Sequence, residues 1–345
     1  MFFLKSKPMK TTDFSKYLTD FLSKYLPGER GMSKNTIDAY RDTFLLLIKY
    51  VTEKKKINIR KLEIEDISKE VITEFLDWLQ RERNCSNATR NLRLSAIHSF
   101  FNFLQYENLS VLHQCQKVFS IKFKKPEKKT IKYLTVDAIK LLLQQPDRTT
   151  GKGLRDLALI SLMYDTGARV QEIIDLTPDM VRLDKPQIIR VTGKGNKVRI
   201  IPLLEKQVEI LKNYMQENGL NLPQTGVYPL FYNNRKEKLT RAGVAHILQK
   251  YVNMARNVDN GMLPEKVGCH SLRHSKAMHL LQAGVNLVYI RDILGHVSVT
   301  TTEIYARADS KQKREAIEKA YVEVLPKEEA IWERNENLLD WLRSL

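Results

Sequence analysis

The sequence predicts a mainly α-helical protein of two domains with one small three-stranded antiparallel sheet. Its 345 residues exceed what a single hydrophobic core usually serves, so two domains are expected. Apolar residues recur at three- and four-residue spacing through most of the chain, which is typical of amphipathic helices. Residues 180–202 instead show short β-rich runs between turn-forming residues. A 43% apolar content is enough for a core in each domain.

Residues 1–121 are expected to form an all-helical bundle. The apolar spacing predicts four helices, over residues 13–25, 36–51, 71–79 and 87–106. Ser33 and Ser68 are suitable N-caps of the second and third helices, because serine side chains accept hydrogen bonds from free backbone amides. The first helix is expected to end before Pro27, because proline lacks the amide hydrogen that a helix interior needs.

A basic linker is expected over residues 122–132. Residues 122–129 contain five lysines, one proline and little that could be buried. Such a segment is either a solvated tether or a run of positive charge that lies along a phosphate backbone, and the sequence leaves both open.

Residues 133–325 are expected to form the second domain, followed by a helical tail over residues 326–345. Thr135 is a suitable N-cap for the first helix of this domain. Helices are expected near residues 136–143, 154–164, 169–176, 205–216, 241–256, 271–283, 287–294 and 299–306. Strands are expected at residues 180–183, 187–191 and 197–202.

The charge of the chain indicates a polyanionic partner. The formal net charge is +17 and the pI is about 9.6, which points to nucleic acid or to an acidic membrane face. The sequence has no apolar run of about 18 residues, so no membrane-spanning helix is expected, and its start does not resemble a signal peptide. Three scattered cysteines argue against a disulfide framework and fit a reducing cytoplasm.

Two basic side chains of the second domain follow or lie between glycines. Arg169 comes two residues after Gly167, at the expected start of a helix, where an arginine adds a bidentate fork to an anion-favouring helix end. Glu172, one turn further on, could orient Arg169. Lys194 lies in a glycine-flanked turn between two strands, from which it could reach a DNA groove or a leaving oxygen. The strand–loop–helix context of a nucleotide phosphate loop is absent from the sequence around Lys194.

A further group of polar side chains lies on the last helices. His270 and Arg273 are one helical turn apart, on one face. His270 and His274 have metal-ligand spacing, but the glutamate of the zinc-protease pattern and a third ligand are missing, so no metal site is expected. His274 and His279 are expected to pack between helices or to lie at the surface. Tyr305, nine residues after His296, is of the residue type that can serve as a nucleophile.

These segments, in this order, resemble the tyrosine recombinase (phage integrase) family. The matching elements are Gly167-Ala168-Arg169, Gly193-Lys194-Gly195, His270-x-x-Arg273, Leu294-Gly295-His296 and Tyr305. Residues 33–104 are similar to the core-binding helical bundle of that family. Xer-like recombinases and the integrases or transposases of mobile elements are the most similar members. The resemblance implies a two-domain DNA clamp that acts as a site-specific recombinase, without metal, cofactor or ATP.

The resemblance also implies a role for each residue that matches a family motif. Tyr305 would attack the scissile phosphate, which forms a 3′-phosphotyrosyl intermediate and frees a 5′ hydroxyl. Arg169 and Arg273 would hold the nonbridging phosphate oxygens. Such transesterification stores the energy of the broken bond in the intermediate, so the strand can be rejoined.

The remaining family residues would handle protons and support the phosphate clamp. Lys194 would protonate the leaving 5′ oxygen, and His270 would assist proton transfer at the tyrosine. His296 would donate a hydrogen bond to the phosphate, and Glu172 matches a supporting acidic position.

Double-stranded DNA is the expected partner, and the family resemblance implies a homotetramer on two DNA sites. The basic residues suggested for DNA contact are Arg90, Arg93, Lys238, Arg241 and His246, most of which would touch phosphate. The apolar tail residues Ile331, Leu338, Leu339 and Leu342 would either dock on a neighbouring protomer or pack on their own domain. An accessory or directionality protein and a place at the nucleoid in the cytoplasm also fit the resemblance.

Two other functions are alternatives to site-specific recombination. A type IB-like topoisomerase uses related tyrosine chemistry and would relax any supercoiled plasmid. A non-catalytic DNA-binding relative would bind tightly and cleave nothing. The motifs alone do not distinguish integration or excision of a mobile element from Xer-type resolution.

Overall fold

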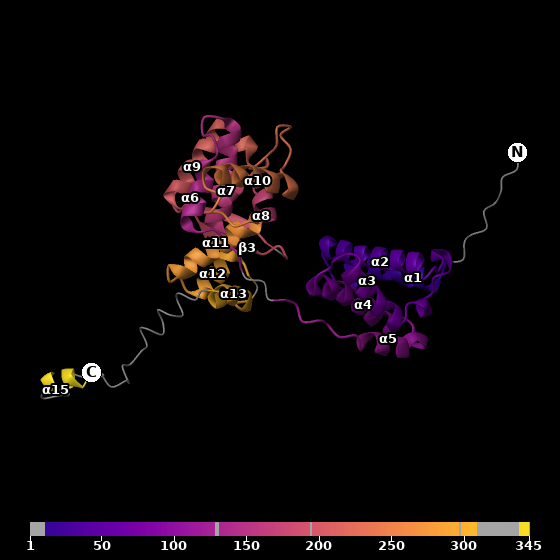
Figure 1. The fold of residues 1–345 in the computed structure, drawn as a ribbon. Coiled ribbons are helices and arrows are strands. Elements are labelled where there is room, and N and C mark those ends of the chain that lie inside the picture. Colours follow the sequence, from indigo (N-terminus) through magenta and orange to yellow (C-terminus); the bar gives the residue numbers. More distant parts are fainter. Residues whose placement is uncertain (1–10, 128–130, 194, 297, 309–337, 345) are drawn as a thin grey trace. The chain divides into compact units, whose positions relative to one another are not determined.

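The computed structural model describes residues 11–127, 131–193, 195–296, 298–308 and 338–344. The chain divides into two compact units, residues 1–129 and 130–345 (Figure 1). Both units are mainly helical, and the second one carries a three-stranded sheet. The predicted fold class is therefore confirmed.

The first unit is a helical bundle around an aromatic core. The rings of Phe21, Phe44 and Phe100 meet edge to face with centroids 5.1–6.2 Å apart, an arrangement that aromatic pairs favour. Ser68 caps its helix as expected, since its Oγ accepts from the amide of Val71 at 3.4 Å. The elements are α1 Asp13–Asp20, η1 Phe21–Glu29, α2 Lys34–Lys54, α3 Lys69–Arg81, α4 Asn87–Glu107 and α5 Leu112–Phe119.

The expected end of the first helix before Pro27 is wrong. The chain continues from α1 into a π-helical segment, η1, that contains Pro27 and runs to Glu29. Phe21 and Leu26 in this segment are fully buried, so core packing outweighs the cost of one missing backbone donor. Helix α5 lies beyond the last helix predicted for this unit and buries Cys115 and Val118.

The first part of the predicted linker is held against the first unit. Arg90 on α4 is buried and its Nη1 donates to the carbonyl of Lys122 at 3.3 Å. The side-chain amides of Asn91 and Asn87 donate to the carbonyls of Lys124 and Lys125 at 2.7 and 2.9 Å. The backbone through Lys125 therefore belongs structurally to the bundle.

The second unit packs one face of a small sheet against its helices. The sheet order is β1–β2–β3, both pairs are antiparallel, and Ile189 pairs with Val181 on one side and Ile201 on the other. The strands are β1 Val181–Arg182, β2 Ile188–Thr192 and β3 Val198–Pro202. The helices are α6 Val136–Gln144, α7 Gly151–Thr166, α8 Val170–Ile174, α9 Glu205–Glu217, α10 Arg241–Val258, α11 Cys269–Gln282, α12 Leu287–Leu294 and α13 Thr300–Ala308.

Local sequence signals locate most of these elements. Thr135 caps α6 as predicted, because its Oγ1 accepts from the amide of Ala138 at 3.2 Å. Helix α12 has the predicted bounds, and α7 extends beyond its predicted range at both ends because Thr150 caps it through the amide of Gly153. In the predicted tail, the structure describes one helix, α15 Leu338–Arg343, while Ile331 lies outside the described residues.

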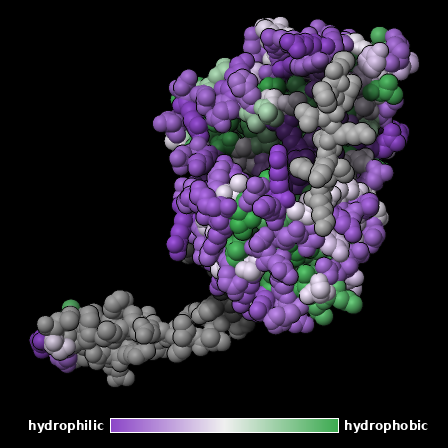
Figure 2. Space-filling view, turned by 90° about the vertical axis from the view of Figure 1, so that its right-hand side faces the viewer, coloured by the Kyte–Doolittle hydropathy of each residue, from purple (hydrophilic) through white to green (hydrophobic). Residues whose placement is uncertain are grey.

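The surface is largely hydrophilic on the face shown in Figure 2, where apolar side chains are scattered in small groups. None of the helices that the structure describes is long and apolar enough to cross a membrane.

Candidate active site

Two glycines that end helices position two arginines of the site. Gly167 ends α7 and Gly295 ends α12, both in the left-handed conformation with φ of +57° and +66°, which glycine adopts without strain. The Gly167 carbonyl accepts from Nη1 of Arg273 at 2.7 Å, and the Gly295 carbonyl accepts from Nη2 of Arg169 at 3.1 Å. Backbone atoms therefore fix both guanidinium groups that the sequence singled out.

Glu172 joins two arginines from different elements. Its carboxylate accepts from the amide and Nη1 of Arg169 at 2.7 and 2.8 Å, the contact expected from their spacing. It also accepts from Nη1 and Nη2 of Arg199 at 3.0 and 2.8 Å. Burial alone would raise the pKa of the Glu172 carboxyl, and the hydrogen bonds from Arg199 and Arg169 bring that pKa below its usual value. Glu172 is therefore a fixed negative charge between the two guanidinium groups.

Arg199 is a site residue that the sequence analysis missed. It lies on β3, and its Nε donates to the carbonyl of Ile293 near the end of α12 at 2.9 Å. Arg199 thus connects β3, α12 and, through Glu172, the start of α8. The one sequence signal was an arginine between two apolar residues of a strand, Val198 and Ile200, with its side chain on the opposite face of the strand.

The positive charge of the site exceeds its negative charge. Arg273 is only 5% exposed, and burial together with the charge of Arg169 lowers its pKa to about 10. Its guanidinium group is therefore still charged at neutral pH. Arg169 and Arg199 bond to the carboxylate of Glu172, and Arg273 adds a third positive charge near it, so an anion bound here would be electrostatically favoured.

A cleft opens beside these arginines. It is lined by Arg169, Gly193, Lys197, Val198, Arg199, Arg291, Asp292, Gly295 and His296. Lys194, the expected acid, lies outside the described residues. The turn that would carry it is closed by a hydrogen bond of 2.8 Å from the Gly193 amide to the Lys197 carbonyl. A Cβ on Gly193 would come within 3.2 Å of Glu172 Oε1, so a glycine lets this turn lie close to the carboxylate.

His296 lies between the arginines and Tyr305. Its Nδ1 is 2.9 Å from Oγ1 of the buried Thr302, and its ring is nearly parallel to the ring of Tyr305, with centroids 6.5 Å apart. Burial and the nearby charges of Arg273 and Arg169 lower the pKa of His296 to about 4. The imidazole is therefore neutral at physiological pH and keeps a ring nitrogen that can take part in a hydrogen bond.

Tyr305 lies at one end of the site. Its side chain is buried, with 1% of its surface exposed. It packs with Ala277, Met278, Leu281, Ile290 and Leu294 from α11 and α12. Burial raises the pKa of its phenol, and the charge of Arg273 acts in the opposite direction. The phenol is therefore protonated at neutral pH and needs a proton acceptor before it can act as a nucleophile.

His274 was expected to pack between helices or to lie at the surface, but its side chain also contacts the candidate nucleophile. Its Nδ1 is 2.9 Å from the hydroxyl of Tyr305. His270, which the sequence placed near the tyrosine, is exposed on the first turn of α11, and its ring centroid is 6.3 Å from that of His274. Spacing along the sequence could not reveal the contact, because the two partners are 31 residues apart.

His279 is a packing residue, as predicted. Its Nδ1 is 2.8 Å from the hydroxyl of Tyr164, and its ring meets the ring of Tyr133 edge to face. Among the residues that the structure describes, no group of three or more His, Cys, Asp and Glu side chains is arranged to hold a metal ion.

The five residues suggested for DNA contact have different surroundings. Arg90 is buried against the linker, which does not support direct DNA contact by its side chain. Arg93 ties α4 to α2 through the carbonyl of Ala39 and the hydroxyl of Thr43, both at 3.0 Å.

The other three suggested residues are exposed and belong to the second unit. Lys238 pairs with Asp175, Nε of Arg241 donates to Oε1 of Gln171 at 2.7 Å, and His246 lies one turn further along α10. Gln171 and Asp175 belong to or directly follow α8, the helix that starts after Arg169. Lys238 and Arg241 are therefore close to the candidate active site.

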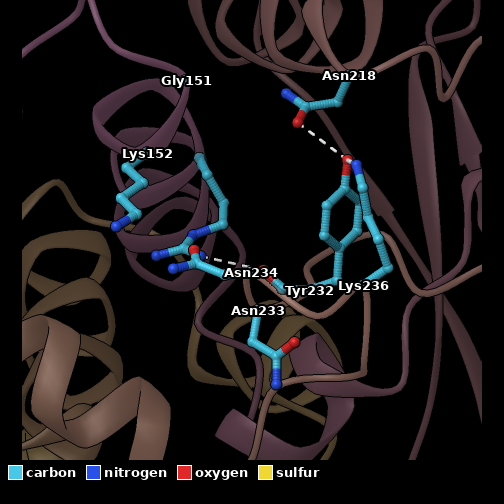
Figure 3. Close-up of a pocket in the computed structure, with 8 residues that line it drawn as sticks. Gly151, Lys152, Asn218, Tyr232, Asn233, Asn234 and Lys236 are labelled. Atoms are coloured by element: carbon cyan, nitrogen blue, oxygen red, sulfur yellow. Dashed lines mark hydrogen bonds between the residues drawn. The ribbon is translucent and has the colours of Figure 1, made fainter.

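A separate pocket lies between the start of α7 and the loop after α9 (Figure 3). Some of its lining residues bond to one another: the hydroxyl of Tyr232 donates to Oδ1 of Asn218 at 2.9 Å, and Nη1 of Arg155 donates to the backbone carbonyl of Tyr232 at 3.0 Å. It shares no lining residue with the cleft beside Arg169.

Two sequence families match most of the chain. The model of the Phage integrase family matches residues 132–312, and that of the Phage integrase, N-terminal SAM-like domain matches residues 18–108. The chain is 35% identical to the integrase/recombinase y4rC of Sinorhizobium fredii over 337 residues, which covers 97% of this chain and 99% of that protein. It is 33% identical to the tyrosine recombinase XerC of Thermodesulfovibrio yellowstonii over 320 residues, which covers 91% and 98%.

Solved structures with the same fold include complexes with DNA. The XerH site-specific recombinase bound to its difH substrate in a pre-cleavage complex has a TM-score of 0.63 and 25% identity, covering 92% of this chain and 85% of that one. The Tn1549 transposon integrase in complex with transposon right end DNA has a TM-score of 0.67 and 18% identity, covering 88% and 98%, a likeness of fold.

Proposed function

The chain belongs to the phage integrase family of tyrosine recombinases, and from this premise we propose how its own residues cut and rejoin DNA. The enzyme is a site-specific DNA recombinase that acts through a 3′-phosphotyrosyl intermediate. One observation supports the assignment of roles to residues. Arg169, Arg273, His296 and Tyr305 lie together around one positively charged site.

Arg169 and Arg273 bind the nonbridging oxygens of the scissile phosphate. The planar fork of a guanidinium group can donate two hydrogen bonds to a pair of phosphate oxygens, and both groups are already oriented by carbonyls of Gly295 and Gly167. Because the donors are fixed before DNA binds, they stabilise the negative charge of the five-coordinate transition state with little reorganisation. His296, neutral at physiological pH, donates a further hydrogen bond to the same phosphate.

Tyr305 attacks the phosphorus atom, and the bond from phosphorus to the 5′ oxygen breaks. Lys194 protonates the leaving 5′ oxygen, since its glycine-flanked turn borders the cleft at Gly193 and Lys197. His270 assists proton transfer from its exposed position on α11. In the reverse step the 5′ hydroxyl of the incoming strand attacks the phosphotyrosine and releases Tyr305.

Lys238, Arg241 and His246 extend the DNA-binding surface beyond the cleft. Lys238 and Arg241 contact side chains on or beside α8, which begins directly after Arg169, so DNA bound at the site passes close to them. Arg93 contributes from the bundle, and the two units together grip the duplex. Arg90 acts indirectly in this account, because it holds the linker backbone at Lys122.

The active assembly is a homotetramer on two DNA sites, with the tail docked on a neighbouring protomer. The sequence of the tail supports this arrangement, because it carries the apolar residues Leu338, Leu339 and Leu342 and an amphipathic helix must bury its apolar residues. Deletion of residues 331–345 should reduce assembly on paired sites and leave single-site binding intact in gel-shift assays. Unchanged assembly would show that the tail packs on its own domain. An accessory or directionality protein would act on this assembly.

A covalent-capture assay tests the assignment of Tyr305. Wild-type protein and Tyr305→Phe are incubated with nicked duplexes that carry the site selected by the wild-type protein from a randomised DNA pool. We expect an adduct that survives SDS with wild type and none with Tyr305→Phe. Tyr164→Phe is the matched control, because the hydroxyl of the half-buried Tyr164, like that of Tyr305, is bonded to a histidine of α11. Equal adduct formation by Tyr305→Phe and wild type would refute the assignment.

The same assay, together with relaxation of a supercoiled plasmid and strand exchange between two sites, separates the alternatives. A non-catalytic relative would bind the duplex without forming an adduct. A topoisomerase would relax any supercoiled plasmid without a preferred site, whereas the recombinase exchanges strands between two copies of its own site.

A further inference from the structure

Helix α11 carries a histidine whose position matches a proton acceptor for the nucleophile. The hydroxyl of Tyr305 is 2.9 Å from Nδ1 of His274, which is within the range that direct proton transfer requires. The two rings are tilted by 56° with centroids 5.7 Å apart. The contact joins α11 to α13, so it exists only in the folded second unit.

We propose that His274 accepts the proton of Tyr305 when the tyrosine attacks DNA, and that it returns this proton when the strand is rejoined. The inference deepens the proposed function and rests on it. In the forward step the phenolic O–H bond breaks and its proton passes to Nδ1 of His274, while the phenolic oxygen bonds to phosphorus and the 5′ oxygen departs. In the reverse step the imidazolium returns the proton to the departing phenolate oxygen.

The charge state of His274 fits an acceptor. Burial, together with the like charges of His270 and Arg273, lowers its pKa, so the ring is neutral at physiological pH and one nitrogen has a free lone pair. The titratable and charged groups that face it are His270 and Arg273 on its own helix, Tyr305 on α13, and His296 in the turn before α13.

The other two histidines of the site are placed less well for this step. Nδ1 of His296 is held by Thr302, and its ring is stacked parallel to the tyrosine ring at 6.5 Å. The ring of His270 lies at the exposed start of α11, with its centroid 6.3 Å from that of His274. The family resemblance assigned proton transfer at the tyrosine to His270, whereas the side chain in direct contact with the tyrosine hydroxyl is His274.

The rate of adduct formation on the nicked duplex described above tests this role. His274→Gln keeps a side chain of similar size and removes the imidazole. We expect its rate of covalent adduct formation to fall by about 100-fold, the lower range for loss of an acid–base group, with DNA binding retained. The matched control is His279→Gln, which removes a half-buried histidine of the same helix that also bonds a tyrosine hydroxyl, that of Tyr164 at 2.8 Å. This control should react like wild type.

Two further readouts distinguish a proton acceptor from a residue that only holds Tyr305 in place. The adduct rate of wild type should be level above pH 7, whereas that of His274→Gln should rise about tenfold per pH unit as hydroxide replaces the lost base. Added imidazole should restore part of the rate of His274→Ala. A purely structural role predicts neither the changed pH profile nor rescue, and a rate of His274→Gln equal to that of His279→Gln would overturn the proposal.

A substrate with sulfur in place of the bridging 5′ oxygen separates the two ends of the reaction. Sulfur leaves without a proton, so this substrate bypasses the need for an acid at the leaving group. His274→Gln should remain slow on it. Recovery of the rate would place His274 at the leaving oxygen instead of the tyrosine and would contradict the proposal.

A measurement on the protein without DNA tests the contact between His274 and Tyr305 separately from the proposed function. In the nitrogen NMR spectrum of labelled protein, Tyr305→Phe should shift the Nδ1 resonance of His274, and Tyr164→Phe should shift that of His279 instead. An unmoved His274 resonance contradicts the contact itself. If wild type forms no adduct while the resonance does shift, the proposed function fails and the hydrogen bond stands.

Discussion

At the residue scale, the site is organised around one buried carboxylate. Glu172 is 5% exposed and binds guanidinium groups from two parts of the fold, Arg169 and Arg199. A buried carboxylate is costly unless it is paired and hydrogen-bonded, so the two arginines stabilise it while it orients them. This mutual dependence holds Arg169 in place before DNA arrives.

Substitution of Arg199 should be destabilising as well as inactivating. Arg199→Met removes two of the hydrogen bonds that Glu172 accepts and leaves its charge less compensated. We expect the free energy of unfolding to fall by about 3 kcal/mol or more, as for other broken buried pairs, in urea denaturation. Arg190→Met is the control, since Arg190 is an exposed arginine of the neighbouring strand that donates to one carbonyl, that of Asp179. A similar, small effect of both variants would contradict the role given to Arg199.

The low pKa of His296 should make stability depend on pH. The pKa is about 4 in the folded protein and about 6.5 in an unfolded chain, so the unfolded state binds the proton first. The stabilising effect is full above pH 6.5 and is lost as the pH falls from 6.5 towards 4. His296→Gln lacks this titration. The difference in unfolding free energy between wild type and this variant should therefore shift against wild type on going from pH 7.5 to 5. A constant difference would show that the pKa is not lowered.

At the scale of elements, the ends of helices position most of the site residues. Helices α7 and α12 end at left-handed glycines whose carbonyls bind Arg273 and Arg169. Helix α8 begins directly after Arg169, and α13 carries Tyr305 to His274 on α11. Short loops between these helices bring the groups together.

A substitution at Gly295 should affect both stability and catalysis. Gly295→Ala places a Cβ 2.7 Å from Nη1 of Arg199 in a backbone conformation with φ of +66°. The conformation alone costs about 1 kcal/mol for alanine, and Arg199 must also move. Gly219→Ala is the control, because Gly219 has φ of +64° with nothing within 4 Å of its Cβ position. Both variants should lose stability, but only Gly295→Ala should lose most of its adduct formation; equal activities would argue that this turn does not position the arginines.

The sequence predicted the elements whose signals are local. The caps Ser68 and Thr135 and the three strands between turn residues depend on neighbours in the chain, and they were located correctly. The continuation of the first helix through Pro27 was not predicted, because burial of Phe21 in the bundle core outweighs the local signal of the proline.

The candidate site divides in the same way. Arg169, Glu172 and Arg273 were identified because they match family motifs in order and spacing, although Arg273 and Arg169 bond to glycines 106 and 126 residues away. Arg199 belongs to none of those motifs and the spacing of His274 gave it no role at the tyrosine, and their partners lie 27 and 31 residues away. Only the packing of the second unit brings these pairs together.

At the scale of the whole molecule, charge governs the interaction with DNA. The net charge of +17 is far above what solubility requires of a chain of this size. The two units and the lysine-rich residues 122–129 between them carry basic side chains that can neutralise phosphates, and each such contact releases counterions from the duplex.

DNA affinity should therefore fall steeply with salt. If the chain neutralises about six to ten phosphates, its affinity for a duplex should drop by roughly 10³- to 10⁵-fold between 50 and 200 mM salt, as measured by fluorescence anisotropy. Lys238→Gln and Arg241→Gln should each reduce the slope of log affinity against log salt by about one. A slope near zero for wild type would contradict a phosphate-dominated interface.

The identity of the DNA–protein bond is the direct test of Tyr305 as the nucleophile. The SDS-resistant adduct is digested with protease and nuclease, and the remaining nucleotide is located by mass spectrometry. We predict a phosphate on the phenolic oxygen of Tyr305, joined to the 3′ end of the cut strand, with a free 5′ hydroxyl on the other fragment. A nucleotide attached to another residue, or joined through its 5′ end, would contradict the account.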